Sequence, residues 1–380
     1  MSDISKYFDY AAATPVLPEV IEAMQPYFSE HFYNPSALYL AARDNRIVLD
    51  DARHAFAQSI GARPTEIIFT AGGTEANNMA LRGVLDQYAD AHVVTSAIEH
   101  ESVLQVVKRY DHTLVGVNQK GLVDVAAIER AIRDTTVVVS IMYANNEIGT
   151  IQPLAEITAM IARLRKQRKA AGNQYPLLVH TDACQAGNYL DMHTARLGVD
   201  MMTINSGKVY GPKQAGALYV KAGIRLQPLL YGGGQEWGIR SGTENLAAII
   251  GFVTAWKKAR QNAGSEVKRL SMLRDAWIAT LQKQAPHIQL NGATGNRRLA
   301  NNIHLTLPGV DNERLIMELD EQGFQIAAGS ACSASNDEPS HVLKALGLSD
   351  SDARSSIRIT MGRYTTESSA KQLLEILIKK

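Results

Sequence analysis

Short apolar runs alternate with amphipathic segments over the first two thirds of the chain, and this alternation constrains the fold most. Six runs have the length and composition of strands, at residues 66–70, 91–97, 136–142, 176–180, 200–205 and 215–220. Segments between them carry apolar residues at helical spacing, at 75–88, 125–133 and 155–170. Such alternation is typical of a mostly parallel sheet covered by helices on both faces. The sequence therefore predicts an α/β fold with one large sheet.

The pattern changes after about residue 245. Two long helical segments, at 244–260 and 265–284, precede a mixed region with strands expected near 302–307 and 355–360 and helices near 312–322 and 366–379. This region predicts a smaller α+β domain. We expect residues 16–250 to form the large domain, and residues 1–15 and 251–380 the small one. A functional site is expected where the two parts meet.

The charge balance argues against a polyanionic partner. The 380 residues carry 39 basic and 38 acidic side chains, and no basic stripe interleaved with aromatic residues is found. Neither nucleic acid nor a membrane is therefore expected to bind directly. No apolar run is long enough to span a bilayer, and residues 1–6 lack the pattern of a secretory signal. We expect a cytoplasmic enzyme and, without a zinc pattern such as His-Glu-x-x-His, no metal site.

Two strand-like runs each lead into a residue suited to pyridoxal phosphate chemistry. Residues 176–180 lead to Asp182, and residues 200–204 lead to Lys208. An ionised carboxylate can hold the pyridine nitrogen protonated, so that the ring accepts electrons, while a lysine amine forms an imine with the cofactor aldehyde. A buried aspartate paired with a lysine between two strands is the structural alternative. The two residues alone leave both interpretations open.

Two further segments fit the same cofactor. His100 follows the strand-like run 93–99, where an imidazole can lie on a heteroaromatic ring and relay protons. Gly73 and Thr74 lie between a strand-like run and a helical segment, where backbone amides and a hydroxyl can hold a phosphate. The structural alternatives are a hydrogen-bonded histidine at a strand end and an ordinary helix cap.

Cys332 lies in a segment of small residues, Ile326–Ser340, just before a predicted helix. A thiol in such a segment is suited to react as a nucleophile, because nearby cations or a helix terminus can lower its pKa from about 8.5. The alternative is a small residue that fills space beneath a loop. Cys184, next to Asp182 in a strand-end turn, is expected to be a packing residue.

Several motifs in a fixed order give the chain a resemblance to one family. They are Tyr7-Phe8-Asp9-Tyr10-Ala11-Ala12-Ala13-Thr14-Pro15, Asn145-Asn146-Glu147-Ile148-Gly149, Arg240-Ser241-Gly242-Thr243 and the segment from Ser356 to Arg363. Together with the residues above, they resemble the cysteine desulfurases, which belong to the class V aminotransferase group of fold type I pyridoxal phosphate enzymes. The resemblance runs over nearly the whole chain.

The resemblance implies a role for each matching residue. Lys208 would carry the cofactor and move the substrate Cα proton, and Asp182, Gln185 and His100 would contact the ring. The phosphate would be bound by Gly73, Thr74, Asn205 and Ser206, and by Thr243 of the other subunit of a homodimer. The substrate carboxylate would be held by Asn34, Asn146 and Arg358, of which Asn146 would also contact the cofactor.

By the same resemblance, the chain would convert L-cysteine to L-alanine and leave the sulfur on Cys332 as a persulfide. A sulfur-acceptor protein, for iron–sulfur cluster assembly or tRNA thiolation, would then take it. Gly207 stands where the family usually has a histidine that contacts the phosphate. Gly207 therefore leaves open a cofactor-impaired scaffold or binding homologue. A selenocysteine lyase or another lyase of the same fold is a separate alternative.

Overall fold

The computed structural model describes residues 3–329 and 339–380. In this part of the chain, seven strands form the larger sheet, in the order β1-β7-β6-β5-β4-β2-β3. They are β1 (Ile67–Thr70), β2 (His92–Ser96), β3 (Asp111–Val115), β4 (Thr136–Ser140), β5 (Leu178–Asp182), β6 (Met201–Asn205) and β7 (Gly216–Val220). Neighbouring strands from β3 to β6 are parallel, and β7 is antiparallel to both β6 and β1. The predicted mostly parallel sheet is confirmed.

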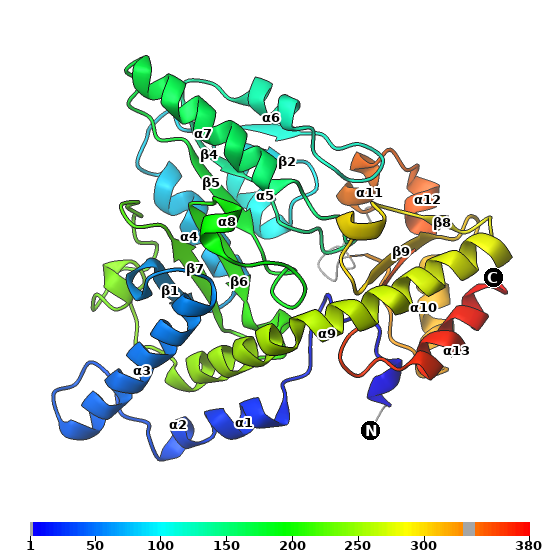
Figure 1. The fold of residues 1–380 in the computed structure, drawn as a ribbon, viewed down its shortest axis with the longest axis horizontal. Helices are drawn as coiled ribbons and strands as arrows, with labels where there is room; N and C mark the ends of the chain where they lie inside the picture. The colour runs from blue at the N-terminus through cyan, green and yellow to red at the C-terminus, as the bar shows by residue number, and fades with distance from the viewer. Residues whose placement is uncertain (1–2, 330–338) are drawn as a thin grey trace.

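Helices bury both faces of this sheet (Figure 1). Side chains alternate between the faces along a strand, and Ile67 and Phe69 of β1 lie in one apolar cluster while Ile68 lies in another. The first cluster includes side chains of α3 (Leu40–Ser59), α7 (Leu154–Ala170) and α9 (Leu246–Gln284). The second is filled mainly by α4 (Gly73–Leu85) and α5 (Glu101–Val107). Burial on both faces explains why these strands read as continuous apolar runs.

Shorter elements complete the larger unit. They are α1 (Pro18–Met24), α2 (Pro26–Ser29), η2 (Pro64–Glu66), α6 (Val125–Ala131), α8 (Thr194–Leu197), η3 (Ser206–Lys208) and η4 (Glu236–Gly238).

A second, antiparallel sheet has its own apolar core. Within the described residues its strands are β8 (Gln289–Leu290), β9 (Asn302–Thr306) and β10 (Ser356–Thr360), in the order β10-β9-β8. It is accompanied by η5 (Gly295–Arg297), α10 (Asn312–Asp320), α11 (His341–Ala345), α12 (Asp350–Arg354) and α13 (Glu367–Leu377). The N-terminal segment, which includes η1 (Ile4–Lys6), joins this unit, because Phe8 lies in its core and Asp9 forms a bridge with Thr360.

Two features differ from the sequence expectation. The expected helices 244–260 and 265–284 form one 39-residue helix, α9, which runs from the core of the large sheet to that of the small one (Figure 1). A Cβ at Gly264 would meet nothing within 4 Å, so this exposed glycine costs some helical stability but does not end the helix. Strand β3 was not expected. The domain boundary at residue 250 stays a prediction, since α9 crosses it.

No helix in residues 3–329 and 339–380 has the length and apolar character needed to cross a membrane.

Candidate active site

Most of the predicted site residues meet in one cavity at the edge of the large sheet. It is lined by Gly73, Thr74, His100, Asn146, Asp182, Gln185, Asn205, Lys208 and Arg358. The reason is topological, because β1, β2, β5 and β6 run in one direction and their carboxyl ends share an edge. Ligands of open α/β sheets bind at this edge.

Asp182 is the last residue of β5, and its side chain is buried. Its Oδ2 accepts a 2.7 Å hydrogen bond from Asn77 Nδ2, and its Oδ1 accepts one of 2.9 Å from the Cys184 backbone N–H. Both carboxylate oxygens therefore have a donor.

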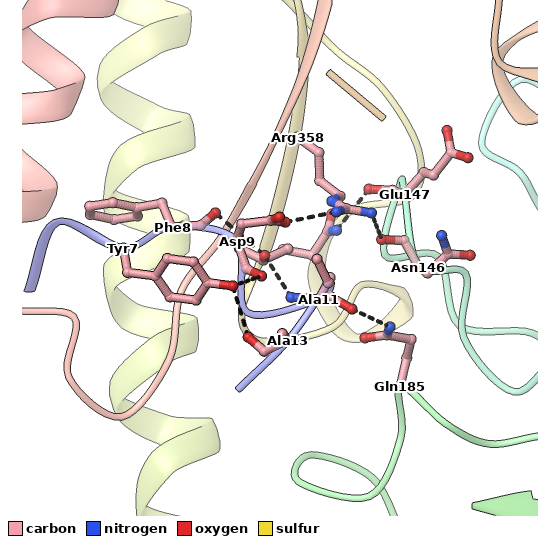
Figure 2. Close-up of polar contacts among 12 residues, drawn as sticks. Tyr7, Phe8, Asp9, Ala11, Ala13, Asn146, Glu147, Gln185 and Arg358 are labelled. Atoms are coloured by element: carbon pink, nitrogen blue, oxygen red, sulfur yellow. Dashed lines mark hydrogen bonds and ion pairs between the residues drawn. The ribbon is translucent and has the colours of Figure 1, made fainter. Parts of the chain in front are cut away.

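Lys208 ends the short turn η3 that follows β6. Its Nζ donates to the backbone oxygens of Ala11 at 2.7 Å and Ala12 at 2.6 Å. Gln185 Nε2 donates to the same Ala11 oxygen at 3.0 Å (Figure 2). Burial lowers the pKa of the Lys208 amine, which favours the neutral, nucleophilic form.

The N-terminus of α4 offers donors for an anion. Gly72 precedes this 13-residue helix with φ of 126°, and no side chain caps it. A Cβ added at Gly73 would lie 2.7 Å from Cys184 Sγ. The start of α4 is therefore packed closely against Cys184, and glycine fits there without displacing the thiol. Uncapped amides at a helix N-terminus bind phosphate groups.

Arg358 projects from β10 toward the cavity and is 1% exposed. Its Nη2 donates to Asp9 Oδ1 at 2.7 Å, and its Nη1 donates to the Asn146 backbone oxygen at 3.2 Å (Figure 2). Its Nε is buried without a hydrogen-bond partner among the described residues. A buried guanidinium with a spare donor is suited to bind a carboxylate.

Taken together, the donor and acceptor groups fit pyridoxal phosphate. Asp182 would face the pyridine nitrogen, the start of α4 would hold the phosphate, and Lys208 offers the amine between them. Bound there, the cofactor would supply an electron sink for a substrate whose carboxylate Arg358 binds.

Three predicted residues do not line this cavity, and a fourth is not among the described residues. Asn34 is exposed, and its Oδ1 accepts from the Ser36 backbone N–H. Ser206 is buried against Gly211. Thr243 is exposed on a loop that lines a different hollow. Cys332 lies outside the described residues. The roles predicted for these four residues stay predictions.

Sequence reasoning missed three polar residues that hold the site together. Asn77 and Ser102 line the cavity, and Asp9 binds Arg358. Asn77 lies one helical turn beyond Thr74, and Ser102 lies two residues beyond His100. Their proximity to predicted site residues was the available signal.

Cys184 lines the cavity but is not suited to react as a nucleophile. Burial, and then the neighbouring Asp182 carboxylate, raises the pKa of its thiol well above the usual value. A thiol that stays protonated is a weak nucleophile. This agrees with its expected packing role.

The variant Gly207→His tests whether this chain binds its cofactor less tightly because it lacks the histidine that the family usually has at this position. Gly207 has no positive φ, and a Cβ there would lie 3.5 Å from Asn205 Oδ1 and 3.8 Å from Lys213 Cγ, which are ordinary contacts. We expect the variant to retain pyridoxal phosphate longer than the wild type during dialysis, because the imidazole adds a donor beside Asn205. Cofactor absorbance after dialysis measures this. Gly207→Ala is the steric control, and faster cofactor loss from the histidine variant alone would contradict the expectation.

Glu99 is a buried carboxyl group behind the cavity. Its Oε1 accepts from Ser96 Oγ at 2.6 Å and from the Met142 backbone N–H at 3.0 Å, and no described residue bonds its Oε2. Burial raises its pKa from 4.5 to about 8. The folded chain therefore holds a proton that the unfolded chain releases, and stability falls as pH rises from 4.5 to about 8.

Glu99→Gln removes this titration while keeping a similar shape. We expect the melting temperature of the variant, relative to that of the wild type, to increase between pH 5 and pH 8.5, as measured by thermal unfolding. A difference that is constant across this range would show that Glu99 does not titrate as expected.

Comparisons with known proteins show the family and the fold of the chain. The sequence profile described as aminotransferase class-V matches residues 6–373. A protein named cysteine desulfurase IscS from Dictyoglomus turgidum is 40% identical over 378 residues, covering 98% of this chain and 93% of its own. A solved structure titled NIFS-LIKE PROTEIN has a TM-score of 0.89 and 29% identity, covering 100% of this chain and 99% of its own. A structure titled "SspA in complex with cysteine" has a TM-score of 0.79 and 33% identity, covering 95% and 100%.

These matches confirm the resemblance found in the sequence and the expected fold. Class V aminotransferases depend on pyridoxal phosphate, so the predicted cofactor is confirmed as well. Lys208, Asp182 and Arg358 line one cavity. Relatives that match nearly the full length of the chain are named cysteine desulfurase. The chain belongs to the class V aminotransferase family, and within it to the cysteine desulfurases.

Proposed function

We propose that this chain is a pyridoxal phosphate-dependent cysteine desulfurase that converts L-cysteine to L-alanine and receives the sulfur on Cys332. The observation that carries the proposal is the convergence of Lys208, Asp182 and Arg358 on one cavity beside an uncapped helix N-terminus. Those groups are the ones needed to hold an amino acid by its carboxylate next to the cofactor.

Each residue has a physical role in this reaction. The α4 amides and Thr74 would hold the phosphate, and Asp182 would pair with the pyridine nitrogen of the bound cofactor. Arg358, oriented by Asp9 and the Asn146 carbonyl, binds the substrate carboxylate. Lys208, whose pKa burial lowers, takes the proton from the substrate Cα.

The sulfur step is assigned to the Cys332 thiolate. The thiolate attacks the substrate sulfur, an S–S bond forms, and the Cβ–S bond breaks with its electron pair left on carbon. Protonation of the carbon fragment gives alanine, so no external oxidant is required. A reducing thiol or an acceptor protein then removes the outer sulfur from the persulfide.

Surface features support the predicted homodimer. Large apolar side chains are exposed on the segment from α1 to α3: Ile21, Phe28, Phe32, Leu38, Leu40 and Ile47. Arg46 of this segment lies 3.9 Å from Glu244, next to Thr243. An exposed apolar patch beside the loop that carries Thr243 is what an interface with a second copy requires. Thr243 is therefore assigned to the partner's phosphate site.

A sulfur-acceptor protein, serving iron–sulfur cluster assembly or tRNA thiolation, would take the sulfur from Cys332. A cytoplasmic location stays a prediction from the sequence.

The proposal is tested with purified protein, pyridoxal phosphate, L-cysteine and a reducing thiol. We expect alanine and sulfide in equal amounts. Selenocysteine as the alternative substrate distinguishes a selenocysteine lyase, which would release alanine from selenocysteine alone. A protein that stays colourless with added cofactor would instead be the cofactor-impaired homologue, and the desulfurase proposal would be wrong.

A further inference from the structure

Asn77 connects the two sides of the cofactor cavity. It lies on α4, and its side chain is fully buried. Its Nδ2 donates to Asp182 Oδ2 at 2.7 Å and to Ser102 Oγ at 2.8 Å. Because a carboxylate only accepts, the amide nitrogen must face Asp182. Both amide hydrogens are thus used, and Asn77 Oδ1 has no partner among the described residues.

Ser102 connects Asn77 to His100 by hydrogen bonds. His100 is the N-cap of α5, and its Nδ1 accepts from the Ser102 backbone N–H at 3.1 Å. Ser102 Oγ lies 2.8 Å from the same Nδ1. The backbone N–H can only donate, so Nδ1 carries no proton. The Ser102 hydroxyl, which already accepts from Asn77, therefore donates its hydrogen to Nδ1.

The ring proton of a neutral His100 must then lie on Nε2. The ring lines the cavity, and Nε2 has no hydrogen bond to a described residue. A hydrogen on Nδ1 would point at two groups that already donate to this nitrogen, so Nδ1 is the acceptor and Nε2 the donor of the ring.

We propose that Asn77 and Ser102 are positioning residues that hold the His100 ring with Nδ1 as an acceptor and the ring proton on Nε2. The inference rests on the proposed function and deepens it. In this state His100 presents a hydrogen-bond donor to negative charge in the cavity and has no free lone pair to act as a base. Removal of the Cα proton then belongs to Lys208. Because the same amide nitrogen also donates to Asp182, Asp182 and His100 share one support.

The ring nitrogens can be read directly by nuclear magnetic resonance. The holoenzyme is labelled with ¹⁵N-histidine and measured at neutral pH without L-cysteine, and His100→Gln identifies the His100 signals. We expect one protonated nitrogen, Nε2, and a bare, hydrogen-bonded Nδ1. A proton on Nδ1, or on both nitrogens, would overturn the proposal.

Three variants separate positioning from a general structural effect. Ser102→Ala should shift the Nδ1 resonance of His100 and leave the cofactor absorption unchanged, whereas Ser102→Thr, which keeps the hydroxyl, should restore the wild-type resonance. Asn77→Ala should shift both the His100 resonance and the cofactor absorption. A wild-type Nδ1 resonance in Ser102→Ala would contradict the proposed hydrogen bonds from Asn77 through Ser102 to His100, even if all variants have the melting temperature of the wild type. Desulfuration is measured separately as alanine and sulfide, so failure of either idea is recognised independently.

Discussion

Lys208→Ala should abolish the formation of alanine and sulfide and remove the yellow colour of the bound cofactor. The amine is the group that joins the cofactor aldehyde, and it lies in the cavity against Ala11 and Ala12. Proton transfer by a positioned group is worth about 10²- to 10⁴-fold in rate, and loss of the covalent attachment adds to this. The visible absorbance and an alanine assay measure the two effects.

A lysine outside the cavity provides the matched control. Lys221 follows β7 and faces Asp200 at 3.9 Å, so Lys221→Ala should retain both colour and turnover. Reduction with borohydride followed by peptide mapping should place the cofactor on Lys208 in the wild type and in the control. Cofactor attached to another lysine would show that the site has been assigned to the wrong amine.

Cys332→Ser should keep the colour and lose sulfide release to the level without enzyme. The colour should remain because the residues assigned to the cofactor, among them Lys208 and Asp182, do not include Cys332. A serine hydroxyl does not ionise near neutral pH, whereas a thiol with a pKa of about 8.5 or below supplies a thiolate that attacks sulfur. Absorbance and sulfide assays on the same sample separate the two functions.

The sequence holds two cysteines, and the other one gives the control. The pKa of the Cys184 thiol is raised well above its usual value by burial, so Cys184→Ala removes a thiol without removing a thiolate. We expect this variant to continue releasing sulfide. Equal losses in both cysteine variants would mean that neither thiol acts alone as nucleophile.

The large sheet was predictable because its central strands are buried on both faces. Strand β4, for example, has an unbroken apolar centre of three valines, residues 137–139, between Thr136 and Ser140. Strand β3 was missed because it lies at the edge, pairs only with β2, and carries polar residues such as Asp111 and Thr113. The joined helix α9 was missed because an exposed glycine reads as a break, although it costs only about 1 kcal/mol against alanine.

The site was predictable where a residue follows a strand end. Asp182 and Lys208 could be placed this way, since parallel strands bring their carboxyl ends to one edge. Asn77 could not, because a polar residue within a helical segment looks the same whether it faces solvent or a buried carboxylate. The Asp9–Arg358 pair joins residues at opposite ends of the chain, and local pattern cannot show such a contact.

The most direct test of the account is the mass of the Cys332 peptide after brief incubation with L-cysteine and no reducing thiol. The account predicts one added sulfur atom on this peptide, its removal by a reducing thiol, and its absence in Lys208→Ala. An unmodified Cys332 peptide from protein that has released alanine would contradict it.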